Sequence, residues 1–213
     1  MKNETSAILD ELMKNYPELT VCNADIKKAY GILFDSYSDG GKLLVCGNGG
    51  SASDSAHIVG ELMKGFKLKR PLEAEKKAAF AGLPDGDYIT ANLQGALPAV
   101  SLTAESALMT AYINDCEPDL VYAQQVYGLM NKGDVLIGLS TSGNSKNVVH
   151  AAVTAKACGG VSIAVTGEKE SRLSSVCDCI IRLPSTDTAH IQELTLPVYH
   201  ALCAMLECEF FDC

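Results

Sequence analysis

One stretch of this chain constrains its fold more than any other: KLLVCGNGGSASDSAHIVGE, from Lys42 to Glu61. A short apolar run, 43–46, stops at the glycine-rich turn 47–51, and a helical pattern follows. This order predicts an anion site, because glycines allow close approach to a ligand and a helix begins with unpaired N–H groups. His57 and Glu61 stand four residues apart, so both point from one helix face. The stretch therefore predicts a phosphate site beside an imidazole and a carboxylate.

The size and composition of the chain predict one globular domain. It has 213 residues, of which 47% are hydrophobic and 20% charged, enough for a core without disulfides or metal. No apolar run approaches the roughly 20 residues that span a bilayer, and the charged N-terminus lacks the apolar core of a signal peptide. We expect a cytoplasmic protein with no membrane partner, whose nine cysteines are buried thiols rather than disulfides.

The charge pattern argues against a general nucleic-acid binder, because the net charge is −9. The segment Lys64–Lys77 is an exception, with six basic residues and two glutamates. Two interpretations stay open. The segment is a solvated surface, or one of its first four basic residues (Lys64, Lys67, Lys69 or Arg70) draws in a phosphorylated substrate.

The apolar periodicity predicts five strands that alternate with helices. Strands are expected over residues 42–46, 99–103, 135–139, 161–165 and 179–183, and helices over residues 5–16, 24–37, 51–64, 105–112, 119–131, 146–158 and 188–209. Such alternation implies right-handed crossovers and a parallel sheet covered on both faces. We expect an α/β fold: a doubly wound, five-stranded parallel sheet flanked by helices, with ligands beyond the carboxyl ends of the strands.

A dinucleotide site is a rival interpretation of the first loop, since Gly47, Gly49 and Ala52 fit the glycine fingerprint. That site needs an acidic residue about twenty positions later to hold a ribose. The segment 66–70, FKLKR, stands there instead and has no acidic residue, and the next predicted strand ends without an acidic residue at Thr103. The sequence therefore disfavours this rival.

A second loop, Ser140–Ser145, has the sequence STSGNS between a predicted strand and a helix. Four hydroxyls and a glycine at this place are typical of neutral donors that converge on an anion. The alternative is ordinary capping of the helix by Asn144 or Ser145, but one capping residue is enough, so three hydroxyls are in surplus. We therefore favour phosphate binding.

Three blocks of the chain resemble, in order and spacing, the signatures of the sugar isomerase (SIS) phosphosugar-binding family, and within it the phosphoheptose isomerases. They are CGNGGSASDSAHIVGEL, GDVLIGLSTSGNSKNVVHA and TAHIQELTLPVYH. The resemblance covers nearly the whole chain from about residue 5. It implies one SIS domain over 1–213 with a flavodoxin-like sheet, N-terminal helices within 1–40 that serve oligomerisation, and a homotetramer with active sites at its subunit interfaces.

The resemblance also implies roles for particular residues. Contacts to the substrate, chiefly to its phosphate and hydroxyls, fall to Asn48, Gly49, Gly50, Ser51, Asp115, Ser140, Thr141, Ser142, Ser145 and Gln192. Four residues match metal ligands and acid–base groups: His57, Glu61, Gln192 and His200. Glu61 is the candidate base and His200 the candidate acid. One Zn²⁺ per site is the implied cofactor and would polarise the carbonyl instead, and a zinc-bound carboxylate is a poorer base, so the role of Glu61 stays open.

The implied reaction converts the ketose D-sedoheptulose 7-phosphate into the aldose D-glycero-D-manno-heptose 7-phosphate through an enediol. In the family this product feeds nucleotide-activated heptose synthesis for surface carbohydrate. Two alternatives remain: isomerisation of a different phosphosugar, and a non-catalytic SIS protein that acts as a phosphosugar sensor or adaptor. The presence of Glu61 and His200 favours an enzyme.

Three features depart from the family pattern. They are an extra segment at about 73–94, expected to be an irregular loop, His190 where relatives usually carry Arg, and Pro197. Gln192 and His200 are eight residues apart, about 12 Å along a straight helix, so one regular helix could supply both to one metal ion only at full stretch. Either the helix bends at Pro197 or two subunits contribute.

Overall fold

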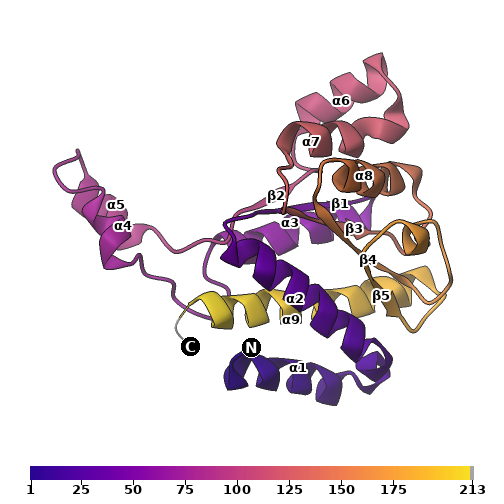
Figure 1. The fold of residues 1–213 in the computed structure, drawn as a ribbon, viewed down its shortest axis with the longest axis horizontal. Helices are drawn as coiled ribbons and strands as arrows, with labels where there is room; N and C mark the ends of the chain where they lie inside the picture. Colours follow the sequence, from indigo (N-terminus) through magenta and orange to yellow (C-terminus); the bar gives the residue numbers. More distant parts are fainter. Residues whose placement is uncertain (212–213) are drawn as a thin grey trace.

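The protein folds around a parallel β-sheet with helices on both faces (Figure 1). The structure is a computed structural model that describes residues 1–211. Within that range the sheet has five strands in the order β2-β1-β3-β4-β5, every neighbouring pair being parallel. The strands are β1 (Leu43–Gly47), β2 (Ala99–Ser101), β3 (Val135–Leu139), β4 (Val161–Gly167) and β5 (Cys179–Leu183). The predicted doubly wound sheet is confirmed, although β2 is shorter and β4 longer than expected.

Helices connect the strands in the predicted order. They are α1 (Asn3–Asn15), η1 (Pro17–Cys22), α2 (Asn23–Ser38), α3 (Gly50–Met63), α4 (Ala74–Ala78), α5 (Gly86–Asn92), α6 (Ser106–Asp115), η2 (Pro118–Leu120), α7 (Val121–Leu129), α8 (Lys146–Ala157), η3 (Leu173–Ser175) and α9 (Thr188–Phe210). Pro197 lies inside α9 without ending it. The helix remains one element of 23 residues because buried contacts along its length offset the lost backbone bond.

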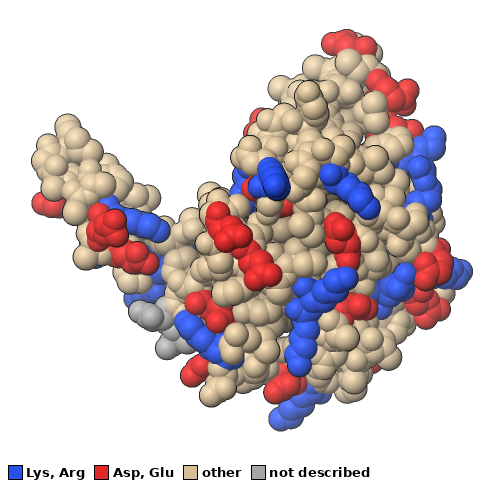
Figure 2. All heavy atoms as spheres, in the orientation of Figure 1, with Lys and Arg blue, Asp and Glu red and all other residues tan. Residues whose placement is uncertain are grey.

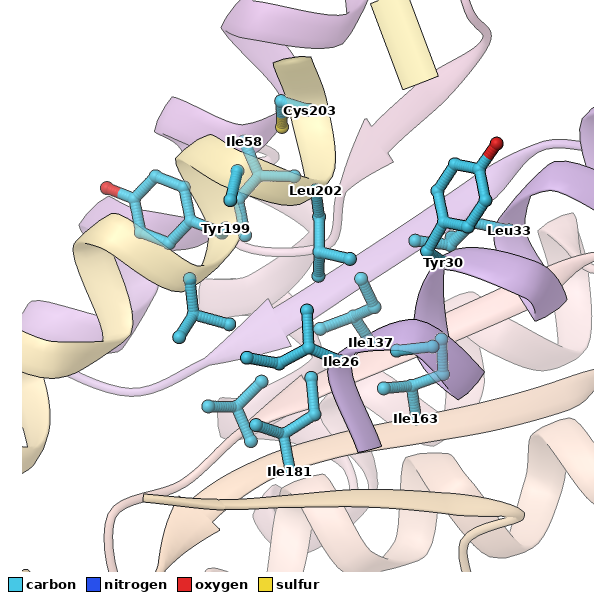
Figure 3. Close-up of a cluster of buried hydrophobic side chains, with 14 of the residues drawn as sticks. Ile26, Tyr30, Leu33, Ile58, Ile137, Ile163, Ile181, Tyr199, Leu202 and Cys203 are labelled. Atoms are coloured by element: carbon cyan, nitrogen blue, oxygen red, sulfur yellow. The ribbon is translucent and has the colours of Figure 1, made fainter. Parts of the chain in front are cut away.

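Two hydrophobic cores lie on opposite faces of the sheet, because alternate strand residues point to opposite sides. Leu43, Val45 and Ile137 face α1, α2, α3 and α9, and Figure 3 shows part of this core. Leu44 and Leu136 face α7 and α8. All five residues of β1 and of β3 are buried, as is typical of parallel strands covered on both sides.

The segment 71–94, which we call the arm, projects away from the sheet (Figure 1). The prediction of an irregular loop was wrong, because the arm contains α4 and α5. Their five and seven residues are too few to show a period, and Gly86 is the one buried residue in either helix. The base of the arm is held by a bridge between Pro71 and Gln94 and by a 2.7 Å bond from the Gly65 N–H to Oε1 of Gln94.

Arg70, at the base of the arm, is a structural residue. Its side chain is fully buried and its Nε donates to Oε1 of Glu207 at 2.8 Å. Its other nitrogens donate to the carbonyls of Leu62 and Glu61, while Glu207 also accepts from the backbone N–H groups of 66–68. Neither sequence interpretation of Arg70 is correct, because the residue is neither solvated nor available to a substrate.

Charges of both signs are interspersed on the face shown in Figure 2. No helix in residues 1–211 is long and apolar enough to cross a membrane. Seven of the cysteines are free thiols, of which four are buried and Cys116 is exposed, whereas Cys208 is disulfide-bonded. The expectation of buried thiols without a disulfide was therefore wrong for Cys116 and Cys208.

Candidate functional site

The glycine turn after β1 and the STSGNS loop after β3 leave the same end of the sheet side by side. We call residues 47–51 the first anion loop and residues 140–145 the second anion loop. Their strands are neighbours, with Gly47 paired to Leu139 in the ladder. A Cβ on Gly47 would lie 2.7 Å from the carbonyl oxygen of Ser51, and Gly49 has a φ of +58°. The tight turn therefore requires glycine at both positions.

The helices that follow the two loops begin without side-chain caps. Neither Gly49 before α3 nor Ser145 before α8 forms a capping bond, whereas Asp187 caps α9 by accepting from the N–H of His190. Asn144 instead bonds to Ser142 and to the backbone of Arg172. The capping alternative for the second anion loop is therefore wrong, and no side-chain cap at Gly49 or Ser145 competes with an anion at either helix start.

The hydroxyls of the second anion loop are arranged around its turn. Ser140 is buried and its Oγ lies 3.1 Å from Oγ of Ser145, while Thr141 is half-buried and Ser142 exposed. A cavity of about 250 Å³ lies beside this loop, and its lining includes Thr141, Ser142, Lys169, Thr186 and Thr188. In the first anion loop, Ser51 is buried and its backbone N–H donates to the carbonyl of Asn48.

His57, Glu61 and His200 lie together where α3 packs against α9. Nε2 of His57 is 3.1 Å from Oε1 of Glu61, and the rings of His57 and His200 have centroids 5.0 Å apart. The predicted juxtaposition of the two α3 residues is therefore present. Burial lowers the pKa of His200, and nearby His57 lowers it further, so the His200 imidazole is neutral at physiological pH.

Tyr199 and Asp54 extend this cluster, and sequence reasoning missed both. The Tyr199 hydroxyl lies 2.9 Å from Nδ1 of His57 and 3.3 Å from Oδ1 of Asp54. Burial is the main cause that raises the pKa of both residues. Asp54 stands three residues before His57, so the sequence alone places both side chains on the same helix face and could have indicated that Asp54 belongs to the cluster. Tyr199 gave no signal, because a tyrosine in an apolar helix reads as core.

Gln192 and Asp115 are not brought into this cluster. A Cβ on Gly50 would lie 3.1 Å from Nε2 of Gln192, so Gln192 sits at the start of α3 and His200 further along. Asp115 is exposed at the end of α6, where its Oδ1 accepts from the side chain of Asn114. Within one chain, therefore, these two residues lie apart from His57 and Glu61.

The donor chemistry of the cluster fits zinc, which prefers imidazole nitrogen and carboxylate oxygen. Nε2 of His200 is buried and has no hydrogen-bond partner. His57, in contrast, is engaged on both nitrogens, by Tyr199 and by Glu61. Across residues 1–211 no three His, Cys, Asp or Glu side chains are arranged to hold a metal ion.

A second cavity, of about 220 Å³, reaches His200 from the side of α1. Lys67 and Phe66 line it, together with Glu11 and Tyr16. Lys64 is exposed, with its Nζ 3.5 Å from Oε2 of Glu61. Two of the basic residues considered from sequence thus lie near the cluster, in contrast to the buried Arg70.

The chain was compared with known proteins. The model of the SIS domain family matches residues 9–81 and 90–167, leaving out 82–89 within the arm. A phosphoheptose isomerase of Maridesulfovibrio salexigens is 36% identical over 205 residues, which cover 96% of this chain and 85% of that protein. A phosphoheptose isomerase of Akkermansia muciniphila is 33% identical, with 99% of this chain and 97% of that protein covered.

Solved structures give the same result. A phosphoheptose isomerase from Francisella tularensis has a TM-score of 0.75 at 27% identity, with 98% of this chain and 100% of that chain covered. The phosphoheptose isomerase of Neisseria gonorrhoeae has a TM-score of 0.69 at 30% identity, with 96% and 94% covered. The similarity therefore extends over the sheet, both anion loops and α9.

Proposed function

Because the chain belongs to the SIS-domain family of phosphoheptose isomerases, we propose that it converts D-sedoheptulose 7-phosphate into D-glycero-D-manno-heptose 7-phosphate. The protein is an aldose–ketose isomerase. Such a reaction gains and loses no atoms. A base removes a proton from C1, an enediol forms, and a proton returns to C2 while the carbonyl moves to C1.

The observation that carries the proposal is the grouping of His57, Glu61 and His200 at a fixed distance from the anion loops. Gly50 and His57 are seven positions apart, a rise of about 10 Å along α3. The chain from C2 of the substrate to its phosphorus atom has about seven bonds and spans roughly 8 Å when extended. An anion site at one end and acid–base groups at the other suit a long open-chain sugar phosphate.

Glu61 is the base in this proposal. Its carboxylate is 13% exposed and contacts Nε2 of His57 at 3.1 Å, which fixes its orientation before substrate binds. His200 is neutral and donates a hydrogen bond to the carbonyl oxygen as negative charge develops there. Tyr199 orients His57 and, through it, Glu61.

We further propose that zinc belongs to the working site. His57, Glu61 and His200 would hold it, and Gln192 is the fourth ligand that the family pattern implies. Glu61 would have to release the ion to act as the base, because a zinc-bound carboxylate is a poorer base. When bound, the ion supplies electrophilic stabilisation of the oxygen on C1 or C2. His57 and Glu61 must first part from each other, since each now uses its ligand atom in their mutual bond.

The anion loops bind the phosphate and hydroxyls of the sugar in this proposal. Backbone N–H groups at the starts of α3 and α8 point at the phosphate, and the loop hydroxyls surround it. The residues assigned here are Asn48, Gly49, Gly50, Ser51, Ser140, Thr141, Ser142 and Ser145.

The working protein is a cytoplasmic homotetramer in this proposal, with sites at subunit interfaces. The position of Asp115 supports it: the carboxylate is exposed on α6, whose main contacts are with η2 and α7. Asp115 therefore reaches a sugar in the cluster of a neighbouring subunit rather than of its own. The 44% exposure of the His57 side chain leaves room for such a neighbour.

A panel of phosphosugars, assayed for turnover with and without added zinc, tests the function. We expect conversion of sedoheptulose 7-phosphate at a kcat/KM at least tenfold above that of any five- or six-carbon ketose phosphate, since even one missing methylene in a pocket typically costs about 10–200-fold. Preference for a shorter ketose phosphate contradicts the proposed substrate and leaves the reaction type standing. Absence of turnover on the whole panel, with and without zinc, contradicts the enzyme.

A further inference from the structure

A pair of asparagine side chains joins the two anion loops. Nδ2 of Asn48 donates to Oδ1 of Asn147, and Nδ2 of Asn147 donates back to Oδ1 of Asn48, both at 2.9 Å. Asn48 belongs to the first anion loop, whereas Asn147 is the second residue of α8, two positions after the end of the second anion loop. These residues are 99 positions apart in the sequence. The reciprocal pair therefore ties the first anion loop, just after β1, to the start of the helix that follows the second anion loop.

Further bonds fix the atoms around this pair. Oδ1 of Asn147 also accepts from the N–H of Val148 at 3.0 Å. Beneath the first anion loop, the hydroxyl of the buried Tyr122 donates to the carbonyl of Gly47 at 2.6 Å and lies 3.4 Å from Oδ1 of Asn48. A tyrosine hydroxyl has one hydrogen, and the shorter contact takes it. Tyr122 thus holds the backbone of the loop, and Asn147 holds the Asn48 side chain.

The pairing decides which end of the Asn48 amide faces an incoming anion. An amide group has one acceptor oxygen and two N–H donors. In the pair, Asn48 uses its oxygen and one N–H, so its second N–H remains available. A flipped amide would set Oδ1 of Asn48 against Oδ1 of Asn147 and turn a lone pair toward the anion. Asn147 therefore keeps Asn48 in the donor orientation that a phosphate requires.

We propose that Asn147 is a positioning residue for phosphate binding, acting through Asn48 and holding the two anion loops in one register before substrate arrives. Preorganisation of this kind improves affinity because the loops and side chains lose less freedom on binding. The proposal rests on the proposed function, since the phosphate is that of the sugar substrate. Asn147 lies at the loops rather than at the acid–base cluster, so its effect is on binding and not on proton transfer.

Steady-state kinetics of Asn147→Ala test the proposal. We expect KM for sedoheptulose 7-phosphate to rise about tenfold while kcat changes by less than about threefold, the pattern of an interaction lost equally from ground and transition states. The dissociation constant of inorganic phosphate, measured by calorimetry, rises by a similar factor. Asn147→Asp has nearly the same shape but no donor for Asn48 and a negative charge at the loops, so both constants rise further.

A double-mutant cycle separates positioning from general loop damage. If Asn147 acts through Asn48, the variant that combines Asn48→Ala with Asn147→Ala binds phosphate no more weakly than Asn48→Ala alone, within about twofold. Asn92→Ala serves as the control, because this asparagine on the arm forms a single bond to the carbonyl of Tyr88. It leaves phosphate affinity unchanged.

Three results overturn the positioning role: unchanged phosphate affinity in Asn147→Ala, additive losses in the double variant, or a fall in kcat with constant KM. The calorimetric arm uses inorganic phosphate and needs no turnover, so it tests Asn147 even where the sugar panel fails. If the wild-type protein turns over the sugar and Asn147→Ala binds phosphate as tightly as wild type, the role of Asn147 is refuted and the proposed function stands.

Discussion

The Tyr199 hydroxyl lies 2.9 Å from Nδ1 of His57, and Nε2 of the same imidazole lies 3.1 Å from Oε1 of Glu61. The hydroxyl of Tyr199 has one hydrogen to give. When it goes to Nδ1, which is closer than Oδ1 of Asp54 at 3.3 Å, the Nε2–H of His57 donates to the Glu61 carboxylate. One buried tyrosine on α9 thus fixes the orientation of a histidine and a carboxylate on α3.

Replacement of Tyr199 by Phe tests this chain of contacts. We expect kcat to fall about tenfold or more, because loss of a residue that orients an active-site histidine typically costs 10–100-fold. The phenyl ring preserves packing, so the free energy of unfolding changes by no more than about 1 kcal/mol. Tyr30→Phe is the matched control, since that hydroxyl bonds to Glu209 instead. Equal kcat in the two variants contradicts the orienting role.

The ion pair between Arg70 and Glu207 is buried, so breaking it is expected to be costly. Arg70→Ala leaves a buried carboxylate without its charged partner, which typically destabilises a protein by about 3–5 kcal/mol. Urea unfolding measures the change. Glu170→Ala removes one partner of the exposed pair with Arg182, where we expect less than about 1 kcal/mol. Similar losses in both variants are incompatible with the burial difference.

The lowered pKa of Glu209 makes the free energy of unfolding depend on pH. Burial opposes ionisation of its carboxylate, but hydrogen bonds from Thr5, Lys2 and Tyr30 together lower its pKa below the ordinary 4.5. A lowered pKa in the folded state gives stability that is present above pH 4.5 and lost as the pH falls through the folded value. Glu209→Gln should therefore be less stable than wild type at pH 7 and equally stable below the folded pKa. A gap that persists unchanged in acid refutes this linkage.

We predict that the protein folds without the arm. The division of the chain into one SIS body and an inserted segment, 73–94, is tested by replacing residues 72–93 with two glycines. The bridge between Pro71 and Gln94 holds the two ends together, so the short link closes without strain. Because α4 and α5 bury one residue between them, we expect the melting temperature to change by less than about 4 °C, equivalent to roughly 1 kcal/mol. A larger loss shows that the arm is part of the core.

The sequence correctly predicts features that depend on local residue patterns. It does not predict the environment of a side chain whose partner lies far away in the sequence. The first anion loop, the facing pair of His57 and Glu61, and the parallel sheet follow from short-range spacing. Arg70 looked like a surface cation because its partner, Glu207, is 137 residues away. Tyr199 looked like core for the same reason, its partner His57 being 142 residues distant. The arm helices were missed because they bury only one residue, so their sequences lack the apolar face by which a helix is usually recognised.

The central claim is that Glu61 moves the proton between C1 and C2. The most direct measurement is ¹H NMR of sedoheptulose 7-phosphate turnover in D₂O by wild type, Glu61→Gln and the control Glu193→Gln, an exposed carboxylate of α9. We predict that wild type and Glu193→Gln form an aldose with deuterium at C2, while Glu61→Gln is slower by about 10³-fold, within the range of lost general-base catalysis. Turnover by Glu61→Gln at the wild-type rate would contradict the account.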